Sequence, residues 1–182
     1  MDLSMLQDVC RRYSDCAEEY YVEPIPKNKA DNARVSLNIP ASEKIAALID
    51  FTVFGSAKDA MVVTEGGLYW KSASEDAQNL TWGQLQHRTI SETNTILSKL
   101  IEFGDGVKMD LLGANKLIKN DNHSVVQLLN DLKKMGEGVN SNKQSTTNSD
   151  GLDSGLVECE FCKSKIKPEV TYCKQCGIKL RG

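Results

Sequence analysis

The sequence predicts an α+β protein: an N-terminal helix, a bent antiparallel sheet or partial barrel closed by a C-terminal helix, and a small cysteine-rich module at the end. Three observations predict this architecture. Apolar residues recur at helical spacing near the start of the chain and again near residue 130, short apolar runs separated by glycine turns lie between them, and two cysteine pairs follow. The 182 residues suffice for one modest domain with small attachments.

Residues 1–26 are predicted to form an amphipathic helix. Asp2 or Ser4 is a suitable N-cap, and Pro24 and Pro26 end the helix. The apolar stripe alternates spacings of three and four residues, as one helix face requires; it consists of Leu3, Leu6, Cys10, Tyr13, Ala17 and Tyr20. Two interpretations are open: the helix docks on the following domain, or it pairs with a partner or a second copy in a homo-oligomer.

Residues 38–136 are predicted to form the main domain. Ser42 is a suitable cap for a first helix that runs through Ile49. The runs 60–64 and 68–71 flank Gly66 and Gly67, a strong signal for a tight hairpin. A short helical or turn segment is expected at 80–85.

Further strands are predicted in the second half of this domain, at 96–103, 107–112 and 116–119, with a turn at Asp105–Gly106. A last helix runs from about Asn122 to Met135, with an apolar stripe formed by Val125, Leu128, Leu129, Leu132 and Met135. Antiparallel strands of this length expose apolar edges unless the sheet curls and another element covers it. We therefore expect the last helix to plug a bent sheet.

Residues 137–155 are predicted to be a flexible linker. They are mostly Gly, Ser, Thr, Asn and Asp, with almost nothing to bury. A linker of this length has a root-mean-square span of about 25 Å. The module at 156–182 is therefore expected to move independently of the main domain.

The cysteine-rich module has the spacing of a metal site, Cys159-x2-Cys162-x10-Cys173-x2-Cys176. Two such pairs at the ends of a short hairpin deliver four thiolates to a tetrahedral zinc ion. Residues 156–182 have few large apolar side chains, so metal binding would have to supply the folding free energy. A four-thiolate ion has no open position, which makes the predicted site structural and not catalytic.

Other interpretations of the cysteines are less economical. Two disulfides would need an oxidising compartment, but the N-terminus lacks the basic start and apolar core of a secretion signal. We therefore expect a reducing, cytoplasmic location. Iron also suits four thiolates, with zinc the default. Cys10 and Cys16 are too far apart along the chain for a local metal pair and are expected to be buried thiols.

The overall charge gives no indication of a nucleic-acid or anionic-lipid partner. The net charge is −3 with a pI of about 5.5, and no apolar run is long enough to span a membrane. Residues 156–182 carry an excess of three positive charges, which zinc with four thiolates reduces to about +1. An alternative function is nevertheless RNA or DNA binding by the module through Lys163, Lys165, Lys167, Lys174 and Lys179.

No catalytic motif is present in the sequence, so we expect a non-enzymatic protein. His87 and His123 are far apart, and Gly55–Ser56 has no base beside it. Trp70 alternates with Tyr69 on the predicted hairpin, so one of the two is expected to face outward. An outward aromatic residue would be a candidate binding anchor. The other interpretation is that Trp70 fills the core and Trp82 covers it.

Four segments of the main domain resemble bacterial pleckstrin-homology-like (PH-like) domains: Glu43–Ile45, Phe51–Asp59, Val63–Trp70 and Leu80–Leu85. The chain departs from the family pattern at Phe51, where an acidic residue is common, at Ala60, where glycine is common, and at Gly66 and Trp82. The resemblance covers 38–136 and implies a seven-stranded bent sandwich closed by a C-terminal helix. The basic pocket that phosphoinositide binding needs is missing, because the first hairpin offers only Lys71.

The last 25 residues resemble the zinc-ribbon family, which PH-like proteins of this kind often carry at their C-terminus. Cys173–Gly177 forms the typical knuckle, whereas Cys159–Lys163 lacks the glycine that usually follows the second ligand. The resemblance thus supports zinc as a structural ion.

Taken together, these patterns predict a cytoplasmic adaptor. The PH-like domain and the ribbon would each contact a protein partner, so that linkage strengthens binding. A nucleic-acid-associated factor is the alternative. An accessory subunit of a bacterial stress or phage-defence system is a weaker one, which no individual residue supports.

Overall fold

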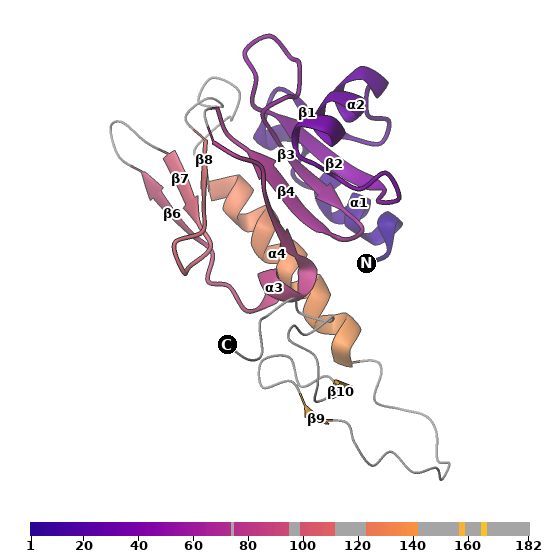
Figure 1. Cartoon of the computed structure of the whole chain (residues 1–182), viewed down its shortest axis with the longest axis vertical. Helices are drawn as coiled ribbons and strands as arrows, with labels where there is room; N and C mark the ends of the chain where they lie inside the picture. The colour runs from indigo at the N-terminus through magenta and orange to yellow at the C-terminus, as the bar shows by residue number, and fades with distance from the viewer. Residues whose placement is uncertain (74, 95–98, 112–122, 142–156, 159–164, 167–182) are drawn as a thin grey trace.

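The computed structural model describes residues 1–73, 75–94, 99–111, 123–141, 157–158 and 165–166. They form an α+β fold with an N-terminal helix, a five-stranded antiparallel sheet, a three-stranded antiparallel sheet and a C-terminal helix (Figure 1). The predicted fold class is confirmed at this level. The predicted strand at 116–119 lies outside the described residues.

The N-terminal helix is shorter than the sequence predicts. α1 spans Leu3–Arg11, and the Asp2 carboxylate caps it by accepting from the Met5 amide at 3.1 Å. A 3-10 turn, η1 (Ser14–Cys16), and a strand, β1 (Tyr20–Val22), follow. The prediction of a helix up to residue 26 is wrong, because two tyrosines and a valine favour extended backbone and pair with the neighbouring strand.

The five-stranded sheet has the order β1-β2-β3-β4-β5, antiparallel throughout. Its strands after β1 are β2 (Ile45–Asp50), β3 (Ala60–Thr64), β4 (Gly67–Lys71) and β5 (Gln78–Thr81). The predicted β3–β4 hairpin is confirmed. The predicted helix ending at Ile49 is wrong: β2 is buried on both faces, and its continuous apolar run has no strand-like alternation.

Two hydrophobic clusters bury the two faces of this sheet. On one face Ile49, Met61 and Trp70 join the cluster that includes α1 and α4. On the other face Val62 and Tyr69 pack with Ala33 of α2 (Lys27–Ser36), a helix that the sequence analysis did not predict. The expectation that either Tyr69 or Trp70 faces outward is wrong, because both faces are covered.

The three-stranded sheet consists of β6 (Ser91–Asn94), β7 (Lys99–Glu102) and β8 (Lys108–Asp110). It shares the larger core, since Trp70 stacks on Phe103 with ring centroids 5.1 Å apart and donates its indole N–H to the Lys108 carbonyl at 3.1 Å. The predicted turn between β7 and β8 is confirmed, with positive φ values at Asp105 and Gly106.

Two helices complete the core. α3 (Trp82–Gln86) matches the predicted helical segment and begins with a capping box between Thr81 and Gln84. α4 (His123–Ser141) runs past the predicted end, into the range expected to be linker. It contacts α1 and α3, and Figure 1 shows it crossing behind the sheets. α1 therefore packs on the domain that follows it, which was the first of the two interpretations of the N-terminal helix.

In the C-terminal module the structure describes two short strands. β9 (Val157–Glu158) and β10 (Lys165–Ile166) pair antiparallel, with Glu158 opposite Lys165. In the part of the chain that the structure describes, no helix is long and apolar enough to cross a membrane.

Candidate interaction site

Two adjacent large apolar side chains are exposed on one loop, residues 51–59, which connects β2 to β3. Across the described ranges, strongly exposed large apolar residues are few: Phe54 is 97% exposed, Val35 80%, Val53 73% and Met5 54%. Val53 and Phe54 belong to the loop, and Val35 belongs to α2. We call the adjacent pair Val53 and Phe54 the apolar patch.

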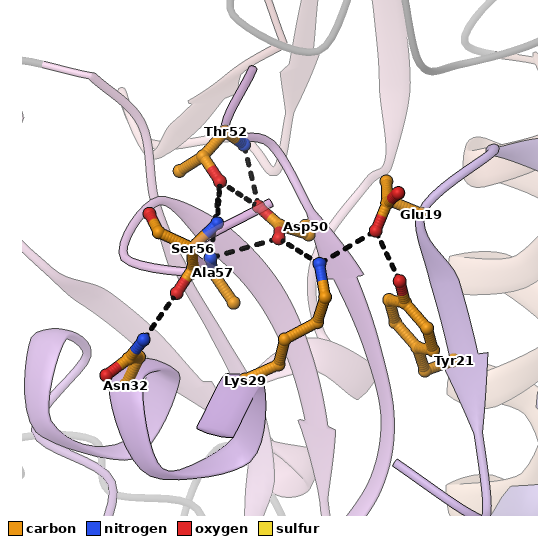
Figure 2. Close-up of polar contacts among 8 residues, drawn as sticks. All are labelled: Glu19, Tyr21, Lys29, Asn32, Asp50, Thr52, Ser56 and Ala57. Atoms are coloured by element: carbon orange, nitrogen blue, oxygen red, sulfur yellow. Dashed lines mark hydrogen bonds and ion pairs between the residues drawn. The ribbon is translucent and has the colours of Figure 1, made fainter. Parts of the chain in front are cut away.

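The loop is shaped by the carboxylate of Asp50, the buried last residue of β2. One oxygen accepts from the Thr52 amide at 2.8 Å and from the Thr52 hydroxyl, and the other accepts from the Ala57 amide at 3.0 Å (Figure 2). The Thr52 hydroxyl oxygen in turn accepts from the Ser56 amide at 2.7 Å. Both ends of the loop are thereby tied to a single buried group.

Backbone geometry completes the turn. The Phe51 amide donates to the Asp59 carbonyl at 2.9 Å and closes the base of the loop. Gly55 and Ala57 have φ values of +67° and +54°, in the region where glycine is favoured. A Cβ at Gly55 would lie 3.0 Å from the Lys29 ammonium, so the loop passes close over this buried cation.

Lys29 of α2 neutralises the buried carboxylate. Its ammonium lies 2.8 Å from Asp50 and 2.7 Å from the carboxylate of Glu19, which also accepts from the Tyr21 hydroxyl (Figure 2). Burial acts to lower the pKa of Lys29, but the hydrogen bonds and charges of Asp50 and Glu19 outweigh it and hold the pKa above its ordinary value. The hydrogen bonds from Lys29 and Tyr21 hold the pKa of Glu19 below its usual range.

α2 also fixes the outer half of the loop. The Asn32 amide donates to the Ser56 carbonyl at 2.9 Å, and the Ser36 hydroxyl donates to the Lys58 carbonyl at 2.5 Å. With Gly55 over Lys29, Ser56 against Asn32 and Lys58 against Ser36, the loop runs alongside α2.

The charges around the patch are mostly paired. Lys27 pairs with Asp31 at 2.5 Å, and Lys71 pairs with Asp59 at 3.1 Å. Lys58 is exposed and makes no ion pair with any residue that the structure describes. On α2, the Arg34 guanidinium donates to the carbonyls of Pro40 and Glu43. The loop thus has an apolar tip, and Lys58 is the one lysine in it.

The predicted zinc ligands Cys159, Cys162, Cys173 and Cys176 lie outside the described residues. Within the ranges that the structure covers, no group of three or more His, Cys, Asp or Glu side chains is arranged to hold a metal ion. Cys10 and Cys16 are buried free thiols, as predicted, and burial raises the pKa of each to about 11.

Neither tryptophan is a surface anchor. Trp70 is fully buried, and Trp82 is nearly so, with its indole N–H donating to the carbonyl of Glu65 at 3.0 Å. The two histidines sit at helix ends: His87 is the C-cap of α3, and His123 is the first residue of α4.

The apolar patch was missed by sequence reasoning. The only local signal is the pair Val53–Phe54 directly before Gly55, two large apolar residues at the tip of a turn. The pairing of Lys29 with Asp50 joins residues 21 positions apart and leaves no local pattern.

Comparison with known proteins gives no assignment: no family model, no curated protein and no solved structure matches this chain.

Proposed function

We propose that this protein is a non-enzymatic cytoplasmic adaptor that binds a protein partner through the apolar patch. The observation that carries the proposal is the exposure of Phe54 and Val53 on a loop whose backbone is hydrogen-bonded on both sides of this pair. Burying a Phe side chain is worth about 1.5–3 kcal/mol, which this surface leaves unused in the isolated chain. Exposed apolar groups gathered in one place are typical of interaction sites.

The arrangement of the elements supports the finer proposal of a PH-like domain. Two antiparallel sheets share one core, and a C-terminal helix packs against it, as a bent sandwich closed by a helix requires. The chain departs from the seven-stranded expectation through the additional edge strand β1 and through α2, which covers the second face of the larger sheet.

The C-terminal module is proposed to be a zinc ribbon in which Cys159, Cys162, Cys173 and Cys176 hold a structural ion. The pairing of β9 with β10 supports it, because the first cysteine pair then lies in the connection between two antiparallel strands. Four thiolates are the donor set that zinc prefers. The ribbon would make a second contact with the partner, and linkage to the patch would raise the overall affinity.

The test is a pull-down from host lysate with three forms of the full-length chain. They are the unmodified protein, Val53→Ser/Phe54→Ser, and Met5→Ser as a matched control, because Met5 is exposed and apolar but lies on α1. Each form is tested with and without nuclease. We expect one protein to be retained by the unmodified and control forms after nuclease treatment and lost with the patch variant.

Two results would overturn the proposal. Retention that disappears on nuclease treatment would favour nucleic-acid binding through the ribbon lysines. Equal retention by all three forms would remove the patch from the binding site.

A further inference from the structure

We infer that Phe54 is a preformed anchor for an apolar pocket with an acidic rim on a protein partner, and that Asp50 and Lys29 are positioning residues that hold this anchor ready. The inference rests on the proposed function. It goes beyond that function by naming the chemistry of the partner surface and the buried groups on which recognition depends.

The loop is preformed because its backbone conformation is fixed from within. The amides of Thr52, Ser56 and Ala57 all donate to Asp50 or Thr52, and the Gly55 amide donates to the Thr52 carbonyl at 3.2 Å. Binding therefore needs no ordering of the loop backbone. Rigid presentation of a side chain in its bound conformation favours affinity by reducing the entropy lost on association.

The exposed and the buried parts of the site are coupled. Asp50 receives the loop amides on one side and the Lys29 ammonium on the other, and the loop backbone passes directly over that ammonium (Figure 2). Loss of Lys29 leaves the Asp50 carboxylate buried without a cation, and loss of Asp50 leaves Lys29 with Glu19 alone. The loop lies directly over these groups, so we expect it to open and admit water. Phe54 would then be presented in many orientations.

The charges favour a protein over a membrane or a nucleic acid. Stable membrane attachment needs a second signal beside an inserted apolar group, commonly a cluster of basic residues. Nucleic-acid binding likewise needs several free cations. Lys58 is the free cation in this loop, while Lys27 and Lys71 are held by carboxylates. An exposed lysine in the same loop as the aromatic anchor complements a pocket with an acidic group at its rim.

The experiment is site-specific photo-crosslinking of the full-length chain in host cells. The photoreactive residue p-benzoylphenylalanine replaces Phe54 in one protein and Met5 in the control. We expect crosslinks from position 54 to one protein, in a segment of apolar residues flanked by Asp or Glu, and none from position 5. Crosslinks to a second copy of this chain, or equal crosslinking from both positions, would overturn the inference.

The positioning role is tested by adding a second substitution to the crosslinking protein. Gly55→Ala disturbs the loop through its positive φ without removing a buried charge, and Asp50→Asn weakens the tie directly. If only about a tenth of the molecules of either variant keep the loop in its binding conformation, the crosslinking yield per folded molecule falls about tenfold. Lys58→Glu should also lower the crosslinking yield. Lys44→Glu is the control, because Lys44 directly precedes β2 and lies outside the loop, and it should leave the yield unchanged.

Hydrogen exchange separates positioning from general destabilisation. In Gly55→Ala the Ser56 and Ala57 amides should exchange faster while amides of β3 keep their protection. Unchanged yield in a variant with an opened loop would show that positioning is irrelevant and contradict the inference.

A lipid control and the pull-down distinguish failure of the anchor inference from failure of the proposed function. Flotation with vesicles of phosphatidylcholine and phosphatidylglycerol should recover no protein, and recovery that depends on Phe54 would replace the protein partner by a lipid surface. Retention of the partner by Val53→Ser/Phe54→Ser in the pull-down would defeat both the anchor and the proposed function. Loss of the partner in that variant, with unchanged crosslinking in the loop variants, would defeat the positioning inference alone.

Discussion

At the scale of single residues, Asp50 is the group on which loop 51–59 depends. It is fully buried, and it accepts from the loop amides and from Lys29. Buried ion pairs add little net stability when intact, but removal of one partner strands the other charge in a low-dielectric environment. The role of Asp50 is therefore visible mainly when it is removed.

Asp50→Ala should lower the free energy of unfolding by about 3–5 kcal/mol, because it removes the acceptor of the Thr52 and Ala57 amides and one of the two carboxylates that hold Lys29. Urea unfolding measures the change. Asp59→Ala is the matched control, since it breaks a half-exposed pair with Lys71 and should cost under about 1 kcal/mol. Equal losses in the two variants would contradict the assignment of Asp50.

Phe54→Ser should change the free energy of unfolding by less than about 0.5 kcal/mol, because the side chain is exposed. Phe51→Ser in the same loop should cost about 3–5 kcal/mol, since Phe51 is buried in the larger core. Urea titrations of both variants measure these changes in the free energy of unfolding. A strongly destabilised Phe54 variant would mean that the chain itself covers this residue.

Stability should fall on acidification through the range in which Glu19 and Asp131 take up protons. Hydrogen bonds from Lys29 and from Tyr13 hold the pKa of Glu19 and of Asp131 below their ordinary values. Each group therefore contributes stability above its unfolded pKa, near 4, that is lost as pH falls through the lower folded value. Urea midpoints measured from pH 7 to pH 3 should show a shallower decline in Glu19→Gln than in the unmodified protein, and an unchanged slope would refute the assignment.

At the scale of elements, the sequence predicts best where local chemistry decides. The β3–β4 hairpin follows from Gly66–Gly67, and α4 follows from its apolar stripe. β2 was misread because burial on both faces removes the alternation that distinguishes a strand. α2 was missed because its exposed face is strongly polar and only a few residues, such as Ala33, reach the core.

Tertiary pairing explains the remaining differences. The apolar stripe of the predicted N-terminal helix continues to Tyr20, yet α1 ends at Arg11 and Tyr20 pairs with Ile49 in the sheet. The contact between Lys29 and Asp50 requires α2 and β2 to be placed first, so no pattern in the sequence indicates it. The apolar patch depends on that same placement.

The capping box of α3 gives a prediction at this scale. Thr81→Ala removes the side chain that accepts from the Gln84 amide and should cost about 1 kcal/mol. Thr81→Ser keeps the hydroxyl and should retain most of that stability. Thermal or urea unfolding distinguishes them, and equal loss in both would mean that the Thr81 methyl group, and not the cap, is what matters.

At the scale of the whole molecule, the proposal combines a rigid domain with a metal-dependent module. Purified protein should contain about one zinc ion per chain, and Cys173→Ser/Cys176→Ser should lose it. The domain that contains α1 to α4 has its own core, so its unfolding transition should be unchanged in this variant. Metal analysis and calorimetry test both statements. A full-length protein without stoichiometric metal would rule out the ribbon.

The most direct test of the central claim is the affinity of the purified partner for the unmodified protein, for Phe54→Ser and for Met5→Ser, each measured at low and at high salt. An apolar anchor predicts a loss of at least about tenfold in Phe54→Ser, no loss in Met5→Ser and weak salt dependence. Affinity that falls steeply with salt and is indifferent to Phe54 would contradict the account and favour binding through charges.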